Sequence, residues 1–310
     1  MAQGLHGIMN SACTGQHNPE NHQPVLVDEV LRYLQPDSTG IYVDGTLGLG
    51  GHTMAILEQS APEGQVLGLE WDNQAADIAE KRLAPYKSRV QIIRTSYAEL
   101  PRAVAQAGYS KIDGLVLDLG VSSLQLDDGD RGFSFRFDAP LDMRMSSGLQ
   151  TTAADLLRTL DSGELADIFY YYGEERQARR IANTIVQARK KEAIATTGQL
   201  AALVAGAIPK RFHPRKIHVA TRVFQALRIA VNRELENLTQ ILECAPALLK
   251  TGARFCIITF HSLEDRIVKR AFSEHSGYRI ITRQPVVPGG REKISNTRSR
   301  SAKLRVAAAV

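Results

Sequence analysis

The segment from Tyr42 to Thr53 reads YVDGTLGLGGHT, and it decides the fold of this chain. It begins at the end of a short apolar run, continues with the acid Asp44, and then holds four glycines before a helical pattern starts. Strand, glycine-rich turn and helix in this order bring the backbone close to a nucleotide-like ligand. Glycines lack the Cβ atom that would keep such a ligand away, and they tolerate positive φ. The segment therefore predicts a ligand site that includes Gly50 and Gly51.

The acids near this turn indicate which ligand to expect. The dinucleotide pattern G-x-G-x-x-G is broken, because Thr53 stands at its third glycine position. Asp44 would repel a pyrophosphate, but it can receive the ammonium group of S-adenosylmethionine. Glu70 ends a second short apolar strand, where a carboxylate can accept both hydroxyls of a ribose. The two acids predict an adenosyl site, and the alternative is a turn that only packs a helix on a sheet.

Length and composition describe an ordinary globular protein with a mildly basic charge. The chain has 310 residues, 44% of them apolar and 23% charged, and a net charge of +5, which permits an anionic partner without requiring one. Its three cysteines form no C-x-x-C pair, which argues against a disulfide framework and a zinc site and fits a reducing compartment. No run approaches the roughly 18 apolar residues of a membrane span. Residues 1–21 are polar and are predicted to be a disordered tail without a signal peptide, so we expect a cytoplasmic protein.

Apolar runs and helical patterns alternate along the first part of the chain. After the run at 41–43, strands are predicted at 66–70, 90–93 and 112–119, with helical patterns between them. This alternation predicts an α/β fold with a parallel sheet and helices on both faces. Ligands bind outside the carboxyl ends of such strands, and these ends hold Asp44, Glu70, Tyr97 and Asp118. We expect these side chains to meet in one site, although any one acid there could be a helix cap.

The alternation stops after the fourth strand. The segment 127–148 has no period but holds three phenylalanines, which favour an ordered loop, and the pattern from 152 to about 222 is helical. We interpret this region as a helical domain inserted after the fourth strand. This region holds many basic residues, and those around Phe212 belong to the loop PKRFHPRK at 209–216. RNA would bind such residues, with a solvated surface as the alternative. The expected RNA contacts are Arg179, Arg180, Lys210, Arg211, Arg215 and Lys216.

The sheet resumes with RFCIITF at 254–260, a fifth apolar strand that ends at His261. Ser262 is predicted to cap the helix that follows, with Asp265 as its partner in a capping box. That prediction leaves His261, at the strand tip, as the residue available for chemistry. A last strand is predicted close to the C-terminus, after a segment rich in basic residues at 298–305.

With these residues in place, the chain resembles the MraW-type ribosomal RNA methyltransferases from about residue 22 onward. The resemblance implies a Rossmann-like class I methyltransferase sheet at 22–126 and 223–310, with an inserted helical RNA-recognition domain at 127–222. Its motifs are DGTLGLGGHT at 44–53, LDLGVSSLQLDD at 117–128, RGFSFRFDAPLDMRM at 131–145, YGEERQARRIA at 172–182, TRVFQALRIAVNREL at 221–235 and FHSLEDRIVKR at 260–270.

The family resemblance also implies an activity and a set of cofactor contacts. It implies S-adenosylmethionine-dependent methylation of the exocyclic N4 of a cytosine in the decoding region of 16S ribosomal RNA. The small ribosomal subunit is then the expected partner, and a homodimer is left open. The family commonly has Asp where this chain has Glu70 and often Phe where it has Tyr97, and either change keeps the chemistry. By matched position the cofactor contacts are Gly50, Gly51, His52, Glu70, Tyr97, Asp118 and Gln125.

The chemistry of such a transfer assigns the catalytic roles. The N4 lone pair of cytosine is delocalised into the ring, so the enzyme must align the reactants and stabilise the charge that appears on N4. Asp118 is predicted to accept a hydrogen bond from the amino group or from the cofactor, and His261 to receive the proton that is lost. The aromatic that stacks on the base is expected from Phe133, Phe135 or Phe260.

Two other classes of function are weighed against this hypothesis. A non-catalytic ribosome-assembly factor could keep the fold and bind RNA, but the set of acids at the strand ends argues against it. A nicotinamide dehydrogenase would need the glycine that Thr53 replaces. A zinc deaminase is set aside because the chain holds no P-C-x-x-C sequence.

Overall fold

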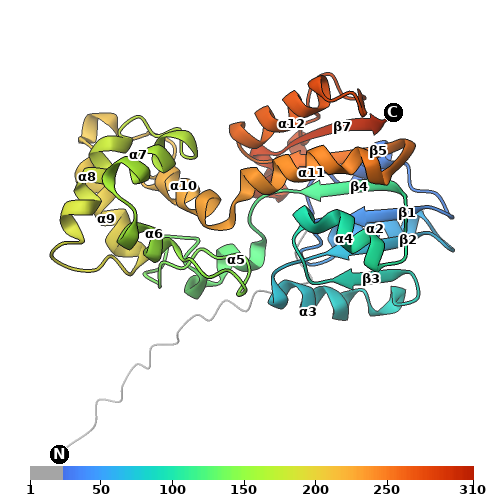
Figure 1. The fold of residues 1–310 in the computed structure, drawn as a ribbon, viewed down its shortest axis with the longest axis horizontal. Coiled ribbons are helices and arrows are strands. Elements are labelled where there is room, and N and C mark those ends of the chain that lie inside the picture. Colours follow the sequence, from blue (N-terminus) through green and yellow to red (C-terminus); the bar gives the residue numbers. More distant parts are fainter. Residues whose placement is uncertain (1–23) are drawn as a thin grey trace, which may run out of the picture.

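The computed structural model describes residues 24–310, which form a seven-stranded sheet flanked by helices and a helical lobe beside it (Figure 1). The predicted α/β class is therefore confirmed. The predicted tail at 1–21 lies outside the described residues.

The sheet has the strand order β3-β2-β1-β4-β5-β7-β6. Its first five strands are parallel, as the alternation predicts, while β7 runs antiparallel to both β5 and β6. The chain moves from β1 outward to β3 and then returns to place β4 on the other side of β1, so a crevice is expected where β1 and β4 end. The strands are β1 Ile41–Asp44, β2 Gln65–Leu69, β3 Val90–Ile93, β4 Ile112–Asp118, β5 Leu249–Thr259, β6 Tyr278–Ile280 and β7 Lys303–Ala309.

Helices cover both faces of the sheet because successive side chains of each buried strand point to opposite faces. Tyr42 belongs to the core on one face and Val43 to the core on the other, and both are almost fully buried. The Tyr42 face packs against α1 Val27–Leu34, α2 Gly51–Gln59 and α3 Asn73–Arg82. The Val43 face packs against α4 Leu100–Gln106, α11 Glu234–Leu248 and α12 Ser262–Glu274.

The helical lobe has an apolar core of its own, to the left of the sheet in Figure 1. Thr152, Asp161 and Thr196 cap three of its helices in capping boxes, which supplies acceptors for the free N–H groups of the first turns. Its helices are α6 Ala153–Thr159, α7 Ser162–Tyr171, α8 Ala178–Ala188, α9 Thr197–Ala207 and α10 Thr221–Asn232.

The segment 127–148 is ordered by its own apolar side chains, as its aromatics indicated. It follows α5 Ser123–Asp127 and includes the 3-10 turn η4 Gly129–Arg131. Phe133, Leu141, Met143 and Met145 are buried in the core of the helical lobe. The backbone N–H of Met145 also donates to Oδ1 of Asn232 on α10, at 2.7 Å. The segment therefore connects the sheet to the lobe as part of the lobe's packing.

The join between lobe and sheet falls at Arg233. This residue has a left-handed φ of 51° and separates α10 from α11. Val223 and Leu227 of α10 are buried in the core of the lobe, whereas Leu238 of α11 belongs to the core of the sheet. The division into domains stays a prediction, and this packing favours placing its second boundary near 233 rather than at 222.

The C-terminal part closes the sheet and returns to the N-terminal part. The sequence predicted β7 but not β6, which has only three residues. Between β6 and β7 lie α13 Gly290–Ser295 and the 3-10 helix η6 Thr297–Ser301. Oε1 of Glu292 accepts a hydrogen bond from the backbone N–H of Leu26 at 2.8 Å. Within residues 24–310, no helix is long and apolar enough to cross a membrane.

Candidate functional site

A cavity of about 840 Å³ lies at the carboxyl ends of the central strands. Its wall combines the turn after β1, the ends of β2 and β4, and parts of α10, α11 and α12. Among the residues predicted to bind cofactor, the structure brings Gly51, His52, Glu70, Tyr97, Asp118 and Gln125 to this wall.

Glu70 is held rigidly at the end of β2. Its Oε2 accepts the backbone N–H of Gly48 and its Oε1 accepts that of Asp72, both at 2.8 Å. Gly48 has a φ of +53°, a conformation that favours glycine. Burial raises the pKa of Glu70 to about 7 although these two N–H groups work to lower it. Glu70 is thus a fixed acceptor, and a positively charged ligand nearby would stabilise its ionised form.

Two residues predicted to contact cofactor are placed behind the wall instead. The carboxylate of Asp44 is buried, where Oδ1 accepts from the backbone N–H of Thr46 at 3.2 Å and Oδ2 from the hydroxyl of Thr53 at 2.8 Å. Gly50 has a φ of +79°, and a Cβ there would lie 3.0 Å from the side chain of Leu83. Neither residue lines the cavity. Both shape the glycine turn, and the packing gives no support to direct cofactor contact by either one.

Asp118 carries an oxygen without a partner. The carboxylate is 22% exposed toward the cavity, yet its Oδ1 is buried and has no hydrogen-bond partner. His52 lies beside it, with Nδ1 at 3.9 Å from Oδ2. Nε2 of His52 is 2.9 Å from the carbonyl oxygen of Val25, so it carries a proton. Burial raises the pKa of Asp118 to about 7, with His52 acting in the opposite direction.

Tyr97 and Gln125 complete the predicted cofactor set. The Tyr97 hydroxyl donates to the backbone oxygen of Glu234 at 3.4 Å, and burial raises the pKa of this hydroxyl. Gln125 forms a capping box with Ser122 at the start of α5, and its Nε2 donates to Oδ2 of Asp72 at 2.9 Å. Both side chains are therefore fixed by contacts from neighbouring elements while they line the cavity.

His261 has a different place from the one predicted. It is the N-cap of α12, and its Nδ1 accepts the backbone N–H of Glu264 at 3.4 Å. Glu264 completes this capping box, because its Oε2 accepts the backbone N–H groups of Phe260 and His261 at 2.8 and 3.3 Å. The predicted Ser262–Asp265 box is therefore wrong: Ser262 donates to Glu174 and Asp265 pairs with Arg305.

The cap also changes which residue of this turn faces the cavity. Phe260 and Glu264 line the cavity, whereas His261 does not. With Nδ1 accepting a backbone N–H, neutral His261 carries its proton on Nε2, which lies 3.0 Å from Oε1 of Glu264. Nε2 is buried without a hydrogen-bond partner, and His261 does not line the cavity, so its proton-accepting role stays a prediction that this packing does not favour.

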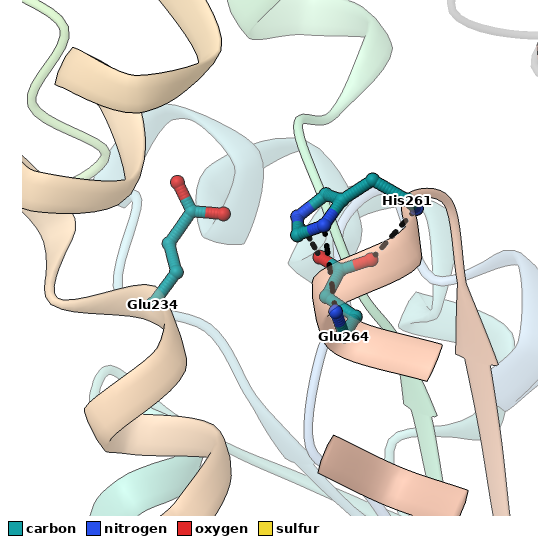
Figure 2. Close-up of side chains that lie close together, drawn as sticks. All are labelled: Glu234, His261 and Glu264. Atoms are coloured by element: carbon teal, nitrogen blue, oxygen red, sulfur yellow. Dashed lines mark hydrogen bonds and ion pairs between the residues drawn. The ribbon is translucent and has the colours of Figure 1, made fainter. Parts of the chain in front are cut away.

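Figure 2 shows that the side chains of Glu234 and His261 point toward each other and that Glu264 lies against the His261 ring. One ligand atom from each of the three lies within 4.8 Å of the others, close enough to hold a metal ion. The guanidinium of Arg228 already supplies a positive charge beside Glu234, because its Nε and Nη2 both donate to the Glu234 carboxylate at 2.8 Å. The arrangement is a buried ion pair with a second carboxylate beside it.

Comparison with known proteins assigns the family. The model of the MraW methylase family matches residues 19–310. The chain belongs to this family. A protein named ribosomal RNA small subunit methyltransferase H from Desulfotalea psychrophila is 58% identical over 92% of this chain and 97% of its own length. A protein of the same name from Cyanothece sp. is 52% identical over 92% of this chain and 94% of its own.

The chain was also compared with solved structures. A structure described as an rRNA methylase from Streptococcus thermophilus has a TM-score of 0.42 and 10% identity, over 92% of this chain and 93% of that one.

The residues expected to bind RNA are exposed in two separate elements of the lobe. Arg179 and Arg180 lie on α8, and the other four lie in or beside the 3-10 turn η5 Lys210–Phe212. Phe212 is half exposed, and the guanidinium of Arg211 lies 4.8 Å from the centre of its ring. Their role in this MraW methylase stays a prediction.

Sequence reasoning missed several residues of the wall. Trp71, Arg228, Glu234, Glu264 and the segment 295–298 all line the cavity. For Glu264 a signal was present, since an acid three residues after a polar residue at a strand end is the capping-box pattern. Arg228 and Glu234 had no local signal, because the left-handed turn at Arg233 that brings them together is not evident from periodicity.

Proposed function

We propose that this protein transfers a methyl group from S-adenosylmethionine to the exocyclic N4 of a cytosine in the decoding region of 16S ribosomal RNA. Membership of the MraW methylase family and the name shared by its relatives support the reaction class and the RNA substrate. One observation of the structure carries the proposal. Two carboxylates, the buried Glu70 and the partly exposed Asp118, face one cavity above the glycine turn at the switch point of the sheet.

The wall fits S-adenosylmethionine better than it fits a dinucleotide. S-adenosylmethionine carries a sulfonium and an ammonium group. The wall offers two carboxylates with raised pKa values, and a positive charge would stabilise their ionised form. The pyrophosphate of a dinucleotide would meet the same carboxylates and be repelled. Glu70 would accept hydrogen bonds from the ribose hydroxyls, while the rings of Tyr97 and Trp71 would lie beside the adenine. When bound, this cofactor supplies a methyl group on a positively charged sulfur.

The protein's own contribution is to orient the cytosine amino group. Asp118 ends β4 with an acceptor oxygen that nothing else in its surroundings uses. An amino N–H that donates to the exposed part of this carboxylate would turn the N4 lone pair toward the methyl donor, which is the alignment that speeds such transfers. The same carboxylate would stabilise the positive charge that appears on N4. Because burial holds its pKa near neutrality, Asp118 can also take the released proton.

The helical lobe would bind the RNA and position it at the cavity. We propose that the exposed residues Arg179, Arg180, Lys210, Arg211, Arg215 and Lys216 contact phosphates of 16S ribosomal RNA in the small ribosomal subunit, in the cytoplasm. The target cytosine must leave its stack to reach a cavity of this depth, as in other enzymes that modify bases.

The direct test is transfer of a labelled methyl group from S-adenosylmethionine to purified small ribosomal subunits, with large subunits as the control substrate. We expect label in small subunits only, and we expect Asp118→Ala to reduce turnover on the order of 100-fold without loss of cofactor binding. Cofactor binding without transfer to any ribosomal substrate would contradict the proposal. Affinity for NAD in place of S-adenosylmethionine would identify a dehydrogenase instead.

A further inference from the structure

Beyond the residues assigned to the cofactor, the cavity reaches a group of charged side chains that folding alone does not explain. Arg228 of α10, Glu234 of α11 and Glu264 of α12 line this part, with exposed fractions of 17%, 9% and 3%. Buried charges cost free energy, and well-packed apolar side chains can often replace them without loss of stability. Their presence at a cavity wall is better explained by a ligand that uses them.

The group presents hydrogen-bond donors beside acceptors. Arg228 uses Nε and Nη2 to hold Glu234, and a guanidinium has five N–H groups, so further donors remain. Oε2 of Glu264 accepts two backbone N–H groups, which fixes the carboxylate and leaves Oε1 beside the His261 ring. Burial acts to raise the pKa of Glu264, but His261, Arg228 and the Phe260 N–H outweigh it and hold the pKa below its ordinary value. Glu264 is thus an ionised acceptor.

This arrangement matches the hydrogen-bonding edge of cytosine. That edge has the N4 amino donor beside two acceptors, N3 and O2, whereas uracil has an acceptor at position 4 and a donor at N3. We propose that Arg228, Glu234 and Glu264 form the subsite that receives the target cytosine, with Arg228 donating to its acceptor edge and Glu264 accepting from its N4 amino group. Glu234 positions Arg228. The inference rests on the proposed function and names the residues that recognise its base.

Two carboxylates would then hold the two N–H groups of one amino nitrogen. Asp118 on β4 is 22% exposed, and both Asp118 and Glu264 line this cavity. With both N–H groups directed to acceptors, the remaining direction at N4 is the one along which the methyl group must approach. Uracil would place a carbonyl oxygen against Glu264, and such juxtaposed acceptors are rejected strongly.

Phe260 supplies an apolar face at the same place. A Cβ at Gly120 would lie 3.4 Å from its ring, so the glycine lets this ring approach the loop that follows β4. A flat base can stack on such a ring, and base–aromatic stacking contributes to binding in many single-stranded nucleic-acid sites. The competing ligand is a divalent cation between Glu234, His261 and Glu264. The guanidinium on Glu234 argues against it, because the cation would lie beside a buried positive charge.

The test compares Glu264→Gln with Glu274→Gln, a control at an exposed position of the same helix. Gln can keep the cap, because the capping box accepts Glu or Gln. The two variants and the wild type are titrated, with S-adenosylhomocysteine present, against decoding-region RNA that carries either cytosine or uracil at the methylated position. We expect the wild type and Glu274→Gln to prefer cytosine on the order of 10- to 100-fold. Glu264→Gln should lose most of that preference and most of its kcat, with unchanged affinity for S-adenosylhomocysteine.

Three results would overturn the proposal. The first is a wild-type cytosine preference in Glu264→Gln together with wild-type turnover. The second is stoichiometric binding of MnCl₂ by the wild type that Glu264→Gln abolishes, which would make the cluster a metal site. The third is a wild type that binds cofactor but methylates no RNA, which also removes the proposed function. If Glu264→Gln does not fold, Arg228→Lys replaces it, and retention of the full cytosine preference by that variant would overturn the proposal.

Discussion

Glu70 and Asp118 present their carboxylates to the cavity in different ways. Both oxygens of Glu70 accept backbone N–H groups, so its direction is fixed before any ligand arrives. Asp118 has one buried oxygen without a hydrogen-bond partner, and its side chain is 22% exposed. In both cases burial opposes ionisation of the carboxyl group, so binding of a positively charged ligand should be coupled to loss of a proton.

Replacement of Glu70 tests its role toward the ribose. Glu70→Ala should cost about 2 kcal/mol of affinity for S-adenosylmethionine, because two hydroxyls would lose their acceptor. Calorimetric titration measures this loss. The control is Glu80→Ala, an exposed residue of α3 paired with Arg94, which should leave the affinity unchanged. Equal affinities in the wild type and Glu70→Ala would remove Glu70 from the site.

The pKa of Asp118 predicts a dependence of stability on pH. Its folded-state pKa of about 7 lies above the ordinary value of 3.8, so the folded state binds more protons than the unfolded state between these values. This group therefore destabilises the ligand-free protein increasingly as the pH rises toward 7. Asp118→Asn removes the effect, and its stability relative to the wild type should rise by about 2 kcal/mol between pH 5 and pH 8. Urea unfolding at both pH values measures this, and a constant difference would show that Asp118 is not a strained buried carboxyl.

Among the elements, α12 and the turn before it show what the sequence could and could not predict. The strand–helix alternation gave the parallel strands and the residues at their ends, because periodicity and strand-end position are local features. The cap of α12 depends on which of His261 and Ser262 has non-helical backbone, which is set by the path of β5 and by Glu174 reaching Ser262 from the lobe. The role of Glu264 at the cavity follows from that choice.

The basic segment around η5 is predicted to bind RNA through its exposed charges. Replacing Lys210, Arg211, Arg215 and Lys216 by alanine should weaken binding of small-subunit RNA and reduce its salt dependence, because fewer counterions are released. Affinity for S-adenosylmethionine should not change. RNA binding measured over a range of KCl concentrations tests this. Four exposed basic residues elsewhere, Lys81, Lys87, Lys269 and Arg279, provide the matched control set. Equal salt dependence of RNA binding in the two sets of variants would show that the segment is only a solvated surface loop.

The whole molecule divides its apolar side chains among cores that meet near Arg233. Those of the lobe form one cluster, and those on the two faces of the sheet form the others. The subsite inferred for the base lies where these parts adjoin, since Arg228 comes from α10 and Glu264 from α12. The sequence located the inserted region through its change of periodicity. The predicted second boundary at 222 falls within the first turn of α10, and the packing of α10 favours a boundary near 233, so the division stays a prediction.

A mutation that creates a cavity in the core of the lobe tests the domain division. Phe169 is fully buried there, and Phe169→Ala should cost about 3–5 kcal/mol of stability. If lobe and sheet are separate domains, this variant should lose affinity for RNA while keeping affinity for S-adenosylmethionine. Phe255→Ala, at an equally buried position in the sheet, should lose cofactor binding. Loss of cofactor binding in both variants through one common unfolding transition would contradict the division.

The central claim is that the protein methylates N4 of a cytosine in small-subunit ribosomal RNA. Mass spectrometry of nucleolytic fragments of this RNA, from cells with and without the gene, tests it most directly. We predict that one methyl group on a decoding-region cytosine disappears without the gene, returns with the wild-type protein, and stays absent with Asp118→Ala. An unchanged methylation pattern in cells that lack the gene would contradict the account.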